Sequence, residues 1–233
     1  NLNSACTRWR TAASVGGSPP GAADWSSGHH LNNGHVLVSP LIRGNRVHDT
    51  STGVQMYYDG LALDNVVWAS STGYGLQSVS GRGNTAWGDT TGFDASSSTL
   101  QDNAAYANGT AIQASSSTVS GNRLNGNTLG LYDGGNNFTS HNVLWSNGTA
   151  VQFHGSWSGD DTQGFLNNTV DQHGGIALLV DASVTNLRLR NNIIRTVDAT
   201  ALQVPASSER GFSSDWNLFD DAGRKPTRAE LRG

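Results

Sequence analysis

The chain repeats one arrangement of polar and apolar positions, in which an asparagine is followed two residues later by an apolar residue or alanine. The arrangement recurs every 19 to 26 residues, at Asn45, Asn65, Asn84, Asn103, Asn122, Asn142, Asn168, Asn192 and Asn217. Self-similarity at such a period indicates one supersecondary unit stacked on copies of itself. The pattern therefore predicts a solenoid, in which each unit packs on its neighbours.

Each unit also contains a short segment, usually introduced by glycine, in which apolar and polar residues alternate. Gly53-Val54-Gln55-Met56 and Gly92-Phe93-Asp94 are examples. A period of two residues predicts a strand with one buried face. Three short strands and three turns fit into about 20 residues, whereas an α-helical repeat needs about 30 or more. The unit is therefore predicted to be one coil of a parallel β-helix.

The two connections within a unit differ in how much their length varies. Ten residues separate Asn45 from Gln55, and this spacing recurs in four other units. The return connection is variable, with 9 residues from Asp94 to the next repeat asparagine and 16 from Gln152 to Asn168. Loops inserted at one edge of a solenoid leave the core undisturbed, and binding sites are often built there. We therefore expect the functional site on this edge.

The form apolar-x-x-Asn-x-apolar, followed by Gly-apolar-x-apolar, resembles the right-handed parallel β-helix repeat of the pectate-lyase-like superfamily. Asn191-Asn192-Ile193-Ile194 and the segment 214–219 are typical of it. The resemblance implies an all-β, single-stranded right-handed parallel β-helix (solenoid) of about 8–9 coils over residues 42–219. It also implies that the Gly-containing strand lies in the first sheet and the asparagine in the tight second turn. A secreted or cell-surface location follows from the same resemblance.

The segments outside the repeat are expected to be irregular. Residues 1–41 are rich in Gly, Ser, Pro and Ala, and we expect them to cover the open end of the β-helix. Residues 220–233 form a polar C-terminal tail. The single cysteine, Cys6, excludes an intrachain disulfide. With 14% charged residues and a net charge of −4, the chain is expected to bind neither nucleic acid nor membrane, and to be a monomer.

Two columns of side chains are predicted to face outward from the Gly-containing strands, one coil apart at about 4.8 Å. The first contains Gln55, Gln77, Asp94, Gln113, Tyr132, Gln152, Leu179 and Gln203. The second contains Tyr57, Val79, Ser96, Ser115, Gly134, His154, Asp181 and Pro205. Amides match sugar hydroxyls and aromatic rings match the apolar faces of sugars, so Gln113, Gln152, Asp94 and Tyr57 are candidate substrate-binding residues. Alternatively, stacked glutamines bond to each other and stiffen the sheet.

His154 and Asp181 fall on consecutive coils and are expected about 5 Å apart. A carboxylate at that distance orients an imidazole and raises its basicity, which suits a proton acceptor. His154 as base and Tyr132 as acid would serve a lyase or an epimerase. The alternative is a surface ion pair without catalysis.

A hydrolytic mechanism would require a second carboxylate near Asp181. If Asp133 turned outward, it would lie about 9–10 Å from Asp181, near the upper separation used by inverting glycosidases. Strand alternation places Asp133 inward by default.

The longest inserted loop, 155–163, follows His154 directly. Its Trp157 is a candidate for stacking on a sugar. Its Asp160 and Asp161 can hold Ca²⁺ through oxygen ligands or merely solvate a turn.

The resemblance, together with the residues of the outer face, implies a β-helix that binds and cleaves a polysaccharide, as a lyase or a glycoside hydrolase. No lysine or arginine stands in either outward column to serve as the base that many lyases of this fold use. The alternative is a noncatalytic surface rod or adhesin that binds glycans or only spans distance.

Overall fold

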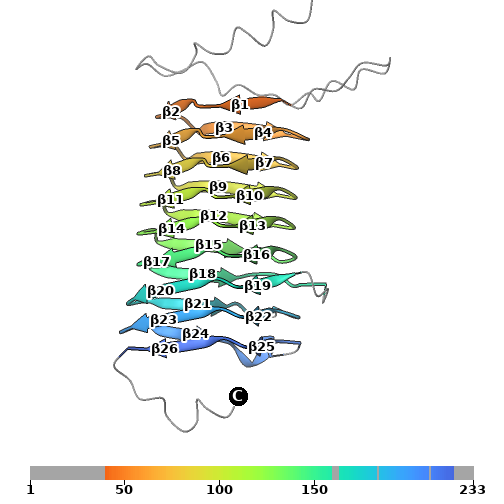
Figure 1. Cartoon of the computed structure of the whole chain (residues 1–233), viewed down its shortest axis with the longest axis vertical. Coiled ribbons are helices and arrows are strands. Elements are labelled where there is room, and N and C mark those ends of the chain that lie inside the picture. Colours follow the sequence, from red (N-terminus) through yellow and green to blue (C-terminus); the bar gives the residue numbers. More distant parts are fainter. Residues whose placement is uncertain (1–39, 159–162, 183, 210, 223–233) are drawn as a thin grey trace, which may run out of the picture.

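The computed structural model describes residues 40–158, 163–182, 184–209 and 211–222. These residues form nine stacked coils, with one strand of each sheet per coil except in the last (Figure 1). The strands of all three sheets are parallel. The predicted all-β parallel β-helix of 8–9 coils is confirmed. The boundaries at residues 41 and 220 stay predictions, because residues 1–39 and 223–233 lie outside the described part.

The three sheets are named A, B and C in the order in which the chain visits them. Sheet A contains β1 (Leu41–Arg43), β4 (Leu61–Leu63), β7 (Ser80–Arg82), β10 (Thr99–Gln101), β13 (Thr118–Ser120), β16 (Phe138–Ser140), β19 (Gly164–Leu166), β22 (Arg188–Arg190) and β25 (Ser213–Asp215). Sheet B contains β2 (Arg46–His48), β5 (Val66–Trp68), β8 (Thr85–Trp87), β11 (Ala104–Tyr106), β14 (Arg123–Asn125), β17 (Val143–Trp145), β20 (Thr169–His173), β23 (Ile193–Val197) and β26 (Leu218–Asp221).

Sheet C contains the longer, Gly-introduced strands. They are β3 (Thr52–Tyr57), β6 (Thr72–Gln77), β9 (Thr91–Ser96), β12 (Thr110–Ser115), β15 (Leu129–Asp133), β18 (Thr149–Phe153), β21 (Ile176–Val180) and β24 (Thr200–Gln203). A short 3₁₀ helix, η2 (Ala206–Ser208), follows β24. Among the described residues, no helix is long and apolar enough to cross a membrane.

Apolar side chains from all three sheets fill the interior of the coils. The largest fully buried ones include Tyr74, Phe93, Phe153 and Phe165. Tyr74 and Phe93 stack with ring centroids 4.6 Å apart, because they occupy the same position on adjacent coils. Burying each such side chain contributes about 1.5–3 kcal/mol, so the core stabilises every coil through its neighbours.

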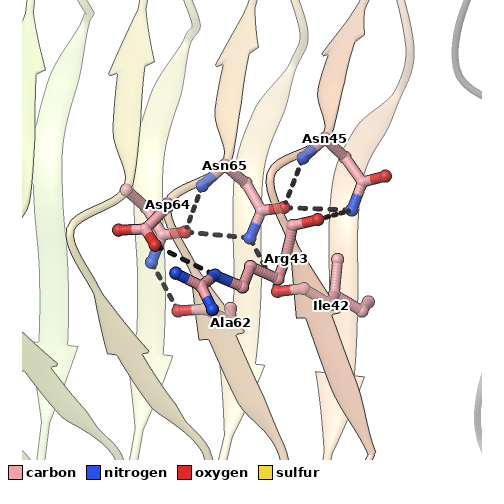
Figure 2. Close-up of polar contacts among 7 residues, drawn as sticks. Ile42, Arg43, Asn45, Ala62, Asp64 and Asn65 are labelled. Atoms are coloured by element: carbon pink, nitrogen blue, oxygen red, sulfur yellow. Dashed lines mark hydrogen bonds and ion pairs between the residues drawn. The ribbon is translucent and has the colours of Figure 1, made fainter. Parts of the chain in front are cut away.

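The repeat asparagines form a continuous ladder in the turn between sheets A and B. The backbone N–H and the Nδ2 of Asn65 both donate to Oδ1 of Asn84, at 3.0 Å each. The same Nδ2 donates to the carbonyl of Ile42 in the preceding coil, at 2.9 Å. Figure 2 shows this pattern where Asn45 bonds to Asn65. All nine asparagines take part, which confirms their predicted structural role.

The residue before each ladder asparagine adopts a left-handed backbone conformation. Their φ angles lie between 54° and 68°, and the residues are Gly44, Asp64, Gly83, Asp102, Gly121, His141, Asn167, Asn191 and Trp216. Seven of the nine are Gly, Asp or Asn, the types that tolerate this conformation best. The sharp corner between sheets A and B therefore has a local cause in the sequence.

Two further ladders stabilise the other corners, and neither was predicted from the sequence. Between sheets B and C the ladder runs through Thr50, Ser70, Asp89, Asn108, Asn127, Asn147 and Gln172. Between sheets C and A it runs through Ser98, Ser117 and Asn137. Side chains of five different types fill these positions, so no single residue type recurs in the sequence to reveal them.

Asp89 is the one acidic member of the ladder between sheets B and C among the described residues. Its Oδ1 accepts from the backbone N–H of Ser70 at 2.7 Å. In Asn108 and Asn127, Nδ2 donates to a carbonyl 22 residues earlier. Asp89 has an oxygen in place of this donor, and its buried Oδ2 lacks a partner in the described part of the chain. Burial raises the pKa of Asp89 to about 6.

Replacing Asn103 by alanine should destabilise the protein by about 3–5 kcal/mol. The Asn103 side chain accepts from Asn84 and donates to Asn122 and the carbonyl of Gly81, all in the buried interior. Urea unfolding measures the change. Gln101→Ala, at an exposed position of the same coil, should cost less than about 0.5 kcal/mol. Equal effects of the two substitutions would contradict a structural ladder.

Asp89→Asn should stabilise the protein at pH 7.5 by about 1–3 kcal/mol, because it restores the missing donor and removes a buried charge. The pKa of Asp89 in the fold, about 6, exceeds its ordinary value of 3.8. Its ionisation therefore costs stability as the pH rises between these values, and the cost is fully present above pH 6.

Urea unfolding at pH 4 and pH 7.5 tests this expectation, with the exposed Asp59→Asn as control. The advantage of Asp89→Asn should be smaller at the lower pH, where Asp89 is protonated in the fold, than at the higher. An advantage of the same size at both pH values would show that ionisation of Asp89 is not its cause.

Candidate functional site

The outer face of sheet C carries the two predicted columns, with one correction. Strand register places Gly75, not Gln77, between Gln55 and Asp94 in the first column. Gln77 aligns with Tyr57 in the second column, where Val79 was expected. Val79 is buried. The strand-introducing glycine of this coil is Gly73, so the sequence around Gly75 was read two residues out of register.

His154 and Asp181 lie side by side just beyond β18 and β21. Nδ1 of His154 is 2.8 Å from Oδ2 of Asp181, and Nε2 of Gln152 donates to both carboxylate oxygens at 3.0 and 2.9 Å. The predicted adjacency of the pair is therefore present. The His154 side chain is 58% exposed and that of Asp181 is 24% exposed. The carboxylate is thus held from two sides, while the imidazole stays accessible.

Tyr132 completes this cluster from the preceding coil. Its ring stacks on His154 with centroids 5.3 Å apart and an interplanar angle of 28°. Partial desolvation raises the pKa of the Tyr132 hydroxyl, and the negative charge of Asp181 raises it further. The phenol therefore keeps its proton at neutral pH and can donate a hydrogen bond. Tyr132, Gln152, His154 and Asp181 are hereafter called the His154 cluster.

Asp133 does not belong to this cluster: it faces inward, as strand alternation predicts by default, so the outward position that a hydrolytic mechanism would require is absent. The side chain is fully buried, because strand alternation in β15 turns it inward beside outward Tyr132. Its carboxylate accepts from Asn137 Nδ2 at 2.6 Å, from Gly135 N–H at 3.2 Å and from Thr139 Oγ1 at 3.0 Å. Burial raises its pKa to about 6, against the lowering effect of these donors. Asp133 thus supports the corner between sheets C and A.

Trp157 is also placed differently from the expectation of a sugar-stacking residue. It is 3% exposed and packs edge-on against Phe153, with centroids 5.9 Å apart. The described start of the inserted loop therefore lies against the core, and the Trp157 indole extends the apolar interior. Asp160 and Asp161, the candidate Ca²⁺ ligands, lie outside the described residues.

The remaining candidate substrate-binding residues follow the same face toward the first coils. Gln113 is exposed and aligns between Asp94 and Tyr132. Asp94 and Tyr57 line a hollow of about 250 Å³, to which Gly75 also contributes. Since β6 and β18 are four coils apart, this hollow lies about 19 Å from the His154 cluster. The structure thus divides the predicted residues between two places on one face.

An aromatic column on the outer face of sheet B was not predicted. Its members are His48, Trp68, Trp87 and Tyr106, each three residues after a ladder asparagine. That constant spacing is the sequence signal that would have revealed it. The rings of Trp68 and Trp87 are 1° from parallel, and those of Trp87 and Tyr106 are parallel. Their faces cover each other, so the column reinforces the stacking of coils and is a poor platform for sugars.

Three parallel sheets with buried polar ladders at their corners define a parallel β-helix repeat protein. The chain belongs to the family described as "Periplasmic copper-binding protein (NosD)", whose sequence model matches residues 38–164, more than half of the chain. This membership agrees with the predicted β-helix repeat, and the description is consistent with a location outside the cytoplasm. No match was found among curated proteins or among solved structures.

The hydrogen bond to Asp181 should fix the neutral tautomer of His154. An ionised carboxylate only accepts, so Nδ1 must carry the proton and Nε2 is left with a free lone pair. Long-range ¹H–¹⁵N NMR spectra of the imidazole at pH 8 should show the Nδ1–H form. Asp181→Ala should lose this preference, whereas Leu179→Ala on the same strand should keep it. An Nε2–H form in the unaltered protein would contradict the proposed orientation.

Proposed function

We propose that this protein binds a polysaccharide along the outer face of sheet C and that His154 acts there as a proton acceptor. The observation that carries the proposal is the hydrogen-bonded set of Gln152, Asp181 and His154 on two adjacent coils. Asp181 orients the imidazole, and Gln152 fixes Asp181. A secreted or cell-surface location belongs to the same proposal, because a polysaccharide substrate would be encountered there.

The cluster suits elimination better than hydrolysis. Standard hydrolysis of a glycosidic bond uses two carboxyl groups about 5–9.5 Å apart. With Asp133 buried, the nearest other carboxylate in the described outward columns is Asp94, four coils from Asp181 and therefore about 19 Å away. The described outward columns of sheet C thus supply a base and a phenol but no carboxylate pair at the separation that hydrolysis uses.

In the proposed elimination, Nε2 of His154 removes the proton on the carbon next to the carboxyl group of a uronic acid residue. The electron pair forms a carbon–carbon double bond and expels the glycosidic oxygen. That oxygen takes a proton from the Tyr132 hydroxyl, so the products are an unsaturated sugar end and a new hydroxyl end. The substrate carboxylate must be neutralised during this step, and the described strands of sheet C contain no lysine or arginine for this purpose.

Copper, which the family description names, does not fit the described residues. Copper sites draw on histidine, cysteine and methionine. No group of three or more His, Cys, Asp or Glu residues gathers in the part of the chain that the structure describes. His48, His154 and His173 each lie beside one carboxylate, and Met56 is 2% exposed. We therefore derive no step of the function from copper.

A noncatalytic glycan-binding rod is the second candidate function. It is favoured by the absence of lysine and arginine from the described strands of sheet C, because binding requires only the amides, the hydroxyls and Tyr132. The two candidates share the binding face and differ in whether products form.

A panel of uronic acid and neutral polysaccharides should separate the candidates, with products followed by absorbance of unsaturated ends and by reducing ends. We expect unsaturated products from at least one uronate polymer, and a loss of about 10²-fold or more in His154→Ala. His173→Ala is the matched control, because His173 also lies beside an aspartate, Asp171, but on sheet B. Its rate should equal that of the unaltered protein.

Each other outcome has a distinct meaning. Reducing ends without unsaturation would reject elimination. Binding without products would support the noncatalytic rod, and full activity of His154→Ala would reject His154 as the base.

A further inference from the structure

The outer face of sheet C has a hollow over its first three coils. The hollow has a volume of about 250 Å³ and spans β3, β6 and β9. It is lined by Thr52, Gln55, Tyr57, Thr72, Gly75, Leu76, Gln77, Asp94 and Ser96. Pockets that enclose drug-sized ligands measure about 300–1,000 Å³. The hollow is therefore on the scale of a single sugar unit.

Gly75 creates this hollow, because it leaves the first outward column without a side chain on β6. Gln55 and Asp94 flank it on the adjacent coils. A Cβ built on Gly75 would come within 2.3 Å of Gln55 Oε1, so the Gln55 amide lies over the gap. Two polar residues, Gln55 and Asp94, thus line the same small space from either side.

The lining is polar and carries one negative charge but no positive one. Gln55 and Gln77 offer amide donors and acceptors, Thr72 and Ser96 offer hydroxyls, and Asp94 offers a carboxylate that only accepts. Sugar hydroxyls can donate to Asp94 and accept from the amides. A uronate would instead place a second carboxylate beside Asp94 with no cation in the lining to offset the repulsion.

We propose that this hollow is a subsite for a neutral sugar residue, separate from the His154 cluster. The inference rests on the proposed binding of a polysaccharide to this face and adds a substrate class to it. Four coils, about 19 Å, separate Gly75 from Gln152. A glycan engaging both places would therefore carry an uncharged residue several units away from the residue that meets His154.

Binding of cellohexaose, xylohexaose, mannohexaose and hexagalacturonate to the full chain tests the subsite by isothermal titration calorimetry. At least one neutral hexasaccharide should bind more tightly than hexagalacturonate, and the variants below should locate this binding at the hollow. Gly75→Ala should weaken that binding tenfold or more. The added methyl group meets only the flexible end of Gln55, and the backbone of Gly75 is not in the left-handed region, so the fold should be kept. Circular dichroism verifies this.

Asp94→Ala is the second variant and should also weaken neutral binding tenfold or more, without any added volume. Gln203→Ala, exposed at the far end of the same column, should leave binding of the neutral hexasaccharide unchanged. Neutral binding that survives both Gly75→Ala and Asp94→Ala would overturn the subsite while leaving polysaccharide binding elsewhere on the face intact. Absence of binding by all three neutral probes would also overturn it, and the product assay would still decide the role of His154.

Discussion

Hydrogen bonding of the corner amides is the constraint on which this structure depends. A coil with three sharp corners turns backbone N–H groups into an apolar interior, where an unpaired donor costs about 1–3 kcal/mol. The side-chain oxygen of the next coil accepts them at all three corners. The coils stack in register, and their core and outer columns align, because the corner N–H groups of one coil are paired with side chains of the next.

The fold was predictable because one corner uses a single residue type throughout. Asn65 and its eight equivalents recur visibly, and the period of about 20 residues permits few other architectures. The ladder through Thr50, Asp89 and Gln172 was not visible, because hydroxyl, carboxylate and amide oxygens all accept the same N–H. Sequence patterns reveal chemistry only where one residue type is used consistently.

The site was predictable to the extent that strand alternation held. His154 and Asp181 meet because each follows its strand by one residue on the outward side. Trp157 could not be placed, since a loop residue has no periodicity and its burial against Phe153 depends on the path of the inserted segment. Gly75 was misplaced because two glycines, Gly73 and Gly75, compete as the start of one strand. The hollow over Gly75 was therefore invisible before the register was known.

The asparagine ladder also has a direction. In each ladder asparagine except the last, Nδ2 donates to the Oδ1 of the following coil, and none donates to an Oδ1 of the coil before. The amide dipoles are therefore oriented head to tail along the axis, and each asparagine presents the same donor and acceptor arrangement as the one it stacks on. A coil can be duplicated or removed as a whole without altering the bonds that its neighbours form. Growth of such a protein by repetition of one gene segment is thus compatible with its hydrogen bonding at every intermediate length.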